Sequence, residues 1–174
     1  MISRKLEWII KGQQGFTLIE VLVALAITGI IGLGAATTTV QVLNQGARNS
    51  DYTTASSHAM NAVYWISRDT QMSQTVTPDG VSGFPLTLEW TEWDSSEYQV
   101  IYSLDDDRLM RTYSVNGGEL NETLVAQYIN SVSDNTTCED ISGVFRVTVT
   151  ATVGEGARAL SVTKTRKITP RPSL

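Results

Sequence analysis

A long run without charged side chains constrains this chain of 174 residues more than any other feature. Between residues 21 and 47 there is no Asp, Glu, Lys or Arg, and the first half of the run is strongly apolar. A helix of about 20 apolar residues is long enough to cross the hydrocarbon core of a bilayer. Residues 16–36 supply that length, so the sequence predicts a membrane-spanning helix near the N-terminus.

Three basic residues precede the predicted span and indicate its direction. Arg4, Lys5 and Lys11 lie on its N-terminal side, whereas nearly all acidic residues follow residue 50. Positive charges next to a span favour the cytoplasmic side of the membrane. We therefore expect the N-terminus in the cytoplasm and the bulk of the chain outside it.

The carboxylate of Glu20 lies inside the apolar segment and needs an explanation. Placing such a charge in a membrane helix costs about 2.5 to 3.5 kcal/mol, and it usually has a partner. A secretory signal cut at the small residues 34–36 gives Glu20 no role. If the segment is a plain N-terminal anchor, the carboxylate of Glu20 only makes insertion into the membrane less favourable and has no role.

A cut between Gly15 and Phe16 would supply the partner. The new α-amine would lie four residues before Glu20, which is about 6 Å along a helix. With a reference pKa of about 8, this amine is largely cationic at neutral pH and can neutralise a carboxylate. The amine of the same chain or that of a neighbouring chain would serve.

The sequence GFTLIEVLVALAI, residues 15–27, closely resembles the type III signal of type IV prepilins and type II secretion pseudopilins. The resemblance implies that a membrane-embedded prepilin peptidase cleaves after Gly15 and methylates the amine of Phe16. It also implies that Glu20 pairs with the N-terminal amine of an adjacent subunit during filament assembly. The expected function is therefore that of a structural subunit, not of an enzyme, and no cofactor is expected.

The same resemblance implies the partners and the location of the chain. The partners would be the peptidase, other pilin or pseudopilin subunits, an assembly platform in the inner membrane, and membrane lipid. The protein would be single-pass in the cytoplasmic membrane before entering a pilus or pseudopilus. The competing interpretation is a membrane-anchored or secreted binding domain that happens to begin with an apolar segment.

Small residues recur at steps of four along the predicted span. Such residues let helix backbones approach closely in a membrane, and the 40° drift at each step suits a slanted helix contact. An Ala-rich and Gly-rich span of ordinary composition would give the same pattern. Residues 29–39, with three Gly and three Thr, have low helix propensity. The small residues spaced by four are Ala24, Thr28, Gly32 and Ala36, and they continue a line along the helix that begins at Glu20.

The remaining pattern predicts an α+β fold of pilin-like arrangement, in which one long helix packs on an antiparallel sheet. Apolar residues recur at helical spacing over residues 40–66. Period-two patterns then predict about five strands, at residues 84–90, 98–104, 109–115, 145–153 and 160–168. We expect a leader at 1–15, a membrane half of the helix at 16–37, an amphipathic half at 38–77, and the sheet at 78–174.

One hairpin carries a narrower similarity. Residues 98–113, YQVIYSLDDDRLMRTY, are similar to the strand-turn-strand of J-type minor pseudopilins, where a Tyr-rich strand precedes a polar turn. A minor subunit is indicated, with the J type as the narrower candidate and a generic minor pilin as the favoured interpretation.

The charge pattern and the single histidine, single cysteine and tryptophans bear on nucleic-acid binding, catalysis and ligand stacking. The formal charge of −5 without a basic stripe argues against nucleic-acid binding. His58 is the single histidine and is expected on the polar side of the helix. The single cysteine, Cys138, lies in a polar stretch and is expected to be a free thiol, with pairing to another subunit as the alternative. Trp65, Trp90 and Trp93 are expected to be core or interface residues and not a stacking platform.

A calcium site is the remaining candidate. Asp105, Asp106 and Asp107 offer the oxygen ligands that calcium prefers. The run lacks the alternate-residue spacing of an EF-hand loop. A solvated turn between two strands is the favoured interpretation, and no metal is predicted.

Overall fold

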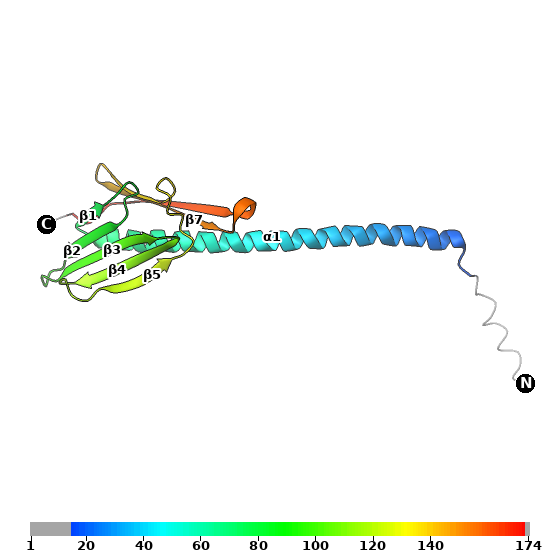
Figure 1. The fold of residues 1–174 in the computed structure, drawn as a ribbon, viewed down its shortest axis with the longest axis horizontal. Helices are drawn as coiled ribbons and strands as arrows, with labels where there is room; N and C mark the ends of the chain where they lie inside the picture. The colour runs from blue at the N-terminus through cyan, green and yellow to red at the C-terminus, as the bar shows by residue number, and fades with distance from the viewer. Residues whose placement is uncertain (1–14, 173–174) are drawn as a thin grey trace, which may run out of the picture. The chain divides into compact units, whose positions relative to one another are not determined.

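The computed structural model describes residues 15–172, which contain one long helix followed by strands (Figure 1). Helix α1 (Leu18–Met72) has 55 residues. Contacts within the chain divide it into two units after Gly46. The strands are β1 (Thr75–Pro78), β2 (Leu86–Thr91), β3 (Glu97–Asp105), β4 (Arg108–Val115), β5 (Asn121–Ala126), β6 (Thr137–Ile141), β7 (Val144–Val153) and β8 (Leu160–Ile168), with a short 3₁₀ turn at Gly156–Arg158.

The first unit is the N-terminal part of α1, whose side chains up to residue 46 are exposed. The most apolar 18-residue window has a mean hydropathy of 2.3, and none of it is buried within the chain. The helix is long and apolar enough to cross a membrane. It stays helical through the Thr-rich stretch, where the hydroxyls of Thr37, Thr38 and Thr39 donate to carbonyls three or four residues earlier at 2.9 Å.

The second unit holds a five-stranded sheet in the order β1-β2-β3-β4-β5, antiparallel throughout. Alternation along the chain places the apolar side chains on one face. On β2, for example, Leu86, Leu88 and Trp90 are buried. The register sets Trp90 opposite Tyr98 on β3, and it sets Tyr102 opposite Arg111 on β4.

A second, three-stranded sheet has the order β6-β7-β8. The long central strand β7 buries Phe145, Val147, Val149 and Ala151. The segment after β5 joins the two sheets, since Ile129 forms a bridge with Ala151. The two sheets therefore contribute to one core.

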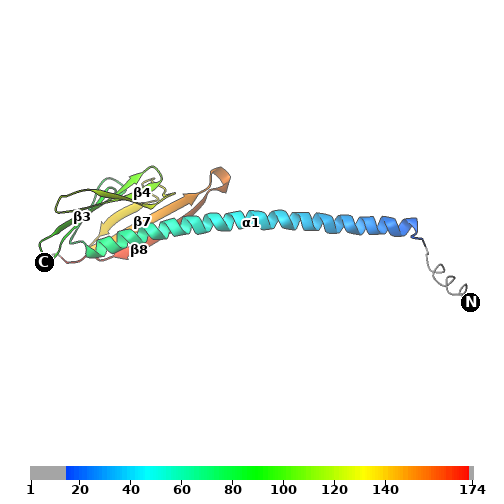
Figure 2. The ribbon, with the colours of Figure 1, turned by 90° about the horizontal axis from the view of Figure 1, so that it is seen from below.

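The C-terminal part of α1 covers this core and packs on both sheets (Figure 2). Ala55, Ala59 and Ala62 recur at steps of three and four and are fully buried, and Ile66 follows them on the same face. Small side chains at these positions let the helix backbone approach the strands closely. The predicted α+β, pilin-like arrangement is thereby confirmed.

Several details differ from the sequence prediction. The helix ends at Met72 and not near residue 77, because residues 75–78 pair with β2 as an edge strand. Pro78 ends this strand, where its missing N–H is tolerated. The strands form two sheets, not one, and the pattern missed β1, β5 and β6, which are short and largely exposed.

Gly83 shows why one loop requires glycine. Its φ is +78°, and a Cβ at this position would come within 1.9 Å of the carbonyl oxygen of Cys138. The neighbouring carbonyl of Ser82 accepts the amide of Cys138 at 2.8 Å. The loop before β2 therefore lies directly against the start of β6.

A buried carboxylate ties α1 to the large sheet. Asp69, with 1% of its side chain exposed, accepts hydrogen bonds from the Tyr102 hydroxyl at 2.6 Å and from Arg111 Nε at 2.7 Å. Burial, and then the Asp69 carboxylate, raise the pKa of Tyr102 above its ordinary value. Burial opposes the charge of Arg111, but the bond to Asp69 outweighs it and raises the pKa of that guanidinium.

We expect Asp69→Ala to lower the free energy of unfolding by about 3 to 5 kcal/mol, because it removes a buried carboxylate that pairs with the partly buried guanidinium of Arg111. Chemical denaturation of the full chain in detergent measures this loss. Asp107→Ala is the matched control, since Asp107 is exposed and its side chain forms no hydrogen bond to the described residues. A loss of less than 1 kcal/mol in Asp69→Ala, or an equal loss in both variants, would contradict the assignment of this contact.

Cys138 lies in β6 and is buried, with 4% exposed, and not in the polar loop that the sequence indicated. Burial raises the pKa of this thiol above its ordinary value of 9.0. The folded state therefore holds the thiol proton more tightly than the unfolded state does. The contribution of this thiol to the free energy of unfolding is complete below about pH 9 and is lost as the pH rises above it.

The decline should be about 1.4 kcal/mol per pH unit above pH 9, which is the slope for one proton. Denaturation of wild type and of Cys138→Ala at a series of alkaline pH values measures this contribution as the difference between their slopes. Tyrosine ionisation affects both proteins and cancels. Equal slopes in the two proteins would show that the thiol is not buried in the folded state.

Candidate assembly site at the start of the helix

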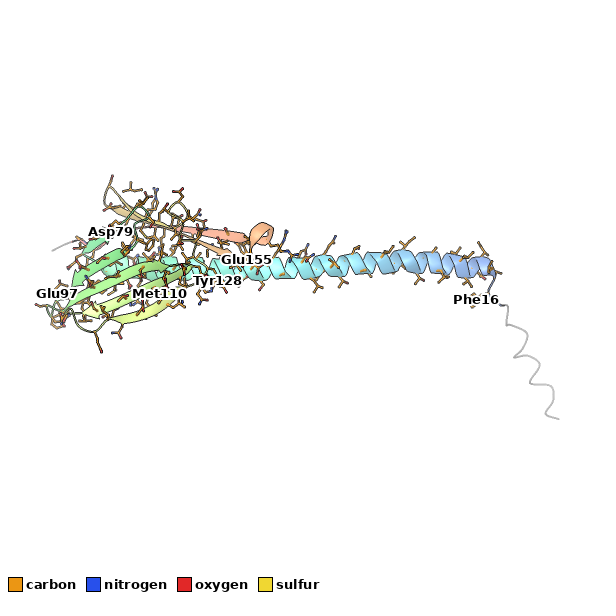
Figure 3. All side chains as sticks on the ribbon, viewed as in Figure 1. Phe16, Asp79, Glu97, Met110, Tyr128 and Glu155 are labelled. Carbon is orange, nitrogen blue, oxygen red and sulfur yellow. The ribbon has the colours of Figure 1, made fainter. Side chains whose placement is uncertain are left out.

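Residues 15–17 precede α1, and the labelled Phe16 lies at the start of the helix (Figure 3). Gly15 is exposed, and a Cβ at this position would meet no atom within 4 Å. The side chain of Phe16 is 86% exposed. The peptide bond between Gly15 and Phe16 is therefore accessible in the described chain.

Thr17 and Glu20 form a capping box at the first turn of α1. The Thr17 amide and hydroxyl both donate to Glu20 Oε2 at 3.0 Å, and the Glu20 amide donates back to Thr17 Oγ1 at 3.3 Å. This reciprocal pattern satisfies backbone N–H groups that a helix start otherwise leaves free. It also holds the carboxylate of Glu20 at the N-terminal end of the helix, beside residue 16.

The position of Glu20 has a chemical consequence. A carboxylate near a helix N-terminus is favoured by the helix dipole, yet within the described residues its hydrogen-bond partner is the neutral Thr17. No cation of the described chain forms an ion pair with it. The arrangement can therefore accept a cation from outside the described residues without first breaking an ion pair.

Apolar side chains surround this carboxylate. A shallow groove of about 310 Å³ is lined by Glu20 and by Ile19, Val23, Ala24 and Ile27. Along the same helix the predicted line of small residues is exposed, and Thr28 Oγ1 donates to the carbonyl of Ala24 at 2.8 Å. A Cβ at Gly32 would meet no atom of the described residues within 4 Å, so this glycine packs against none of them. Ala36 ends the line and is exposed as well.

The three aspartates at the β3–β4 turn are not arranged as a metal site. Asp105 accepts from Arg108 at 3.3 Å, Asp106 has a φ of 53°, and the backbone carbonyl of Asp107 accepts the amide of Ile129 at 2.7 Å. Among the described residues no group of three or more metal-ligating side chains is present. The calcium candidate thus gains no support.

His58 has a structural contact that the sequence did not indicate. Its Nδ1 accepts the amide of Gln127 at 3.1 Å, and its ring meets that of Tyr128 edge-on, with centroids 5.3 Å apart. One turn further along α1, Asn61 donates to the carbonyl of Val125 at 2.6 Å. The histidine therefore fastens the end of β5 to the helix and is only partly exposed.

Two parts of these sites were missed from the sequence, and only one carried a local signal. The capping box is visible as T-x-x-E at residues 17–20, before an apolar run. The pairing of Asp69 with Arg111 joins residues 42 positions apart. No local pattern marks such a pair, because it depends on the fold.

Comparison with known proteins supports the class indicated by the helix start. A family model described as the prokaryotic N-terminal methylation motif matches residues 10–36. No curated protein and no solved structure matched the chain.

The family match and the apolar helix together support a type IV pilin-like or pseudopilin-like protein. They fit anchoring in a membrane through α1, and they fit interaction with a prepilin peptidase and with other pilin subunits. The motif suggests a structural subunit and not an enzyme. The leader predicted at residues 1–15 lies outside the described residues, apart from Gly15.

Thr17→Val should open the first turn of α1, because the side chain of valine cannot accept the amide of Glu20 or donate to its carboxylate, and only the backbone amide of residue 17 still donates to Glu20. Loss of an N-cap costs about 1 kcal/mol, which is about a fivefold change in an opening equilibrium. Hydrogen exchange of the Glu20 amide, followed by NMR on the uncut chain in micelles, measures this change. Thr17→Ser keeps the hydroxyl and is the control, and equal exchange in the two variants would contradict the capping box.

Proposed function

We propose that this chain is a subunit of a type IV pilus or of a type II secretion pseudopilus. It is inserted in the cytoplasmic membrane, cut after Gly15 by a prepilin peptidase, and methylated at the amine of Phe16. It then joins a filament through α1. The observation that carries this proposal is the carboxylate of Glu20, which is held at an exposed helix start beside Phe16 without a cation from the described chain.

The charge balance supports pairing of Glu20 with a Phe16 amine. An unpaired carboxylate in lipid is costly, and the amine created by cleavage is cationic at neutral pH. Pairing neutralises both groups at once. The pairing would also fix how far one helix slides along the next, because the groove around Glu20 is otherwise apolar and non-directional.

We propose that the parts of the chain differ in whether they are removed, lie in the membrane or lie outside the cytoplasm. Residues 1–15 are the cytoplasmic leader that maturation removes, and residues 16–37 are the membrane and assembly half of the helix. The helix from residue 47 to Met72 belongs to the globular unit, which lies outside the cytoplasm. Lipid, an assembly platform in the inner membrane and neighbouring subunits are its partners.

The exposed small residues of α1 support helix packing in the filament. Ala24, Thr28, Gly32 and Ala36 lie on an exposed surface with no partner in the described chain. Close approach of helices at such positions increases van der Waals contact where lipid offers no hydrophobic driving force. These positions would contact the helix of an adjacent subunit.

Within the class, we assign the chain to the minor subunits. The feature that supports the J type is the similarity of residues 98–113, which correspond to the hairpin of β3 and β4. The globular domain gives no further support for this subtype. A membrane-anchored binding domain remains the competing function, and the processing of the chain distinguishes the two.

Processing and assembly are tested together with Glu20→Val. We expect mass spectrometry of the wild-type N-terminal peptide to find a methylated Phe16, and we expect the variant to be cut in the same way. Incorporation of the variant into filaments should fall at least about tenfold, because a charge left without its partner costs about 3 to 5 kcal/mol.

The matched control is Glu155→Gln, which changes an exposed glutamate whose side chain forms no capping hydrogen bond. It should be cut and incorporated like the wild type. An uncut Met1 or a start at Thr37 would overturn the proposed class. Normal incorporation of Glu20→Val would overturn the charge pairing while leaving the class intact.

A further inference from the structure

A cleft beside the C-terminal turns of α1 gathers the aromatic residues that the sequence left without a common role. Its volume is about 570 Å³, and all of its lining residues belong to the globular unit. Pockets for small ligands span about 300 to 1,000 Å³. The helix contributes Trp65 and Arg68, the β2 side contributes Trp90 and Trp93, and β4 contributes Arg111 and Tyr113.

The aromatic rings form a wall of the cleft with one free ring at its rim. Trp90 and Tyr98 stack with centroids 5.3 Å apart and planes 5° from parallel, and Tyr113 follows at 6.1 Å from Tyr98. Trp93, in the β2–β3 loop, is 94% exposed. This loop lies at the end of the sheet where β3 begins, near the labelled Glu97 (Figure 3). An exposed indole next to such a wall offers a large apolar surface that a ligand can cover.

Two guanidinium groups supply hydrogen-bond donors to the same cleft. Arg68 and Arg111 have their Cζ atoms 4.6 Å and 5.4 Å from the centroid of Trp65. Arg111 bonds Asp69 through Nε, and no carboxylate of the described residues forms a bidentate pair with it. Its Nη groups therefore keep donor capacity, held in place by the buried carboxylate.

Acidic side chains in the β2–β3 loop supply acceptors. Glu92 and Asp94 both line the cleft. The carboxylate of Asp94 accepts the amide of Ser96 at 3.0 Å, and this bond lowers the pKa of Asp94. Asp94 is therefore ionised at neutral pH and accepts hydrogen bonds without donating any.

The mixture of charges indicates the class of ligand. An anionic ligand would meet Glu92 and Asp94, and a cationic ligand would meet Arg68 and Arg111. A neutral ring that carries several hydroxyl groups can use the donors and the acceptors together, and its C–H face can pack on an indole. We propose that this cleft binds a neutral saccharide, with a sugar ring on Trp93 and its hydroxyl groups on the charged side chains.

The proposal is independent of filament assembly, because the cleft uses no residue of the first unit of α1. Binding should therefore be unchanged in Glu20→Val. Failure of saccharide binding would leave the proposed pilin-like function intact, and failure of assembly would leave the cleft intact.

The experiment uses the full chain, purified in a detergent without a sugar headgroup. Isothermal titration with cellohexaose, chitohexaose and maltohexaose is compared with titration of an anionic oligogalacturonate and a cationic chitosan hexamer. We expect saturable binding of at least one neutral hexasaccharide and none of the charged ones. Trp93→Ala should weaken this binding about tenfold or more, while Trp93→Phe keeps part of it.

The matched control is Tyr52→Ala, which removes a half-exposed aromatic ring of α1 outside the cleft and should bind like the wild type. Since Trp93 is almost fully exposed, its replacement does not threaten folding. Absence of binding by all three neutral hexasaccharides would overturn the proposal, as would binding that persists in Trp93→Ala. Loss of filament incorporation in Trp93→Ala without saccharide binding in the wild type would assign the cleft to a subunit contact instead.

Discussion

The self-contained hydrogen bonding of α1 is the constraint on which the rest of the structure depends. A helix satisfies its own backbone N–H and C=O groups, so the same element can lie in lipid or against a sheet. Over its first part the side chains are exposed and mostly apolar, and over its last part alanines and Ile66 are buried. One helix of 55 residues is thereby suited to two environments, and only its side chains differ between them.

Two carboxylates on this helix illustrate the same electrostatic rule with different outcomes. Asp69 is buried and is paired within the chain by Arg111 and Tyr102, so its charge fixes the sheet on the helix. Glu20 is held only by neutral Thr17 among the described residues. A charge removed from water needs a partner, and the partner proposed for Glu20 is the N-terminal amine that cleavage would create on its own or another chain. The first carboxylate therefore stabilises a fold, and the second is suited to assembly.

The sequence predicted the features that depend on local periodicity or on the length of an apolar run. The apolar run, the long helix and the longer strands follow from patterns within about ten residues, and β3, β4, β7 and β8 lie close to their predicted limits. The strands β5 and β6 have few buried residues, so their alternation is weak. The division into two sheets, the burial of Cys138 and the contact of His58 with Gln127 depend on tertiary packing, which no local pattern encodes.

The aromatic cleft follows from a mismatch between the helix and the sheet that it covers. A helix with its side chains is about 10 to 12 Å wide, whereas five strands spaced by about 4.8 Å span about 19 Å. One helix therefore cannot cover the whole apolar face of the large sheet. Where α1 ends at Met72, large rings such as Trp90, Tyr98 and Tyr113 partly shield that face, and Arg111 closes it against Asp69. The remaining space is the cleft, so an opening lined with aromatic and charged side chains arises from covering a wide sheet with a single helix.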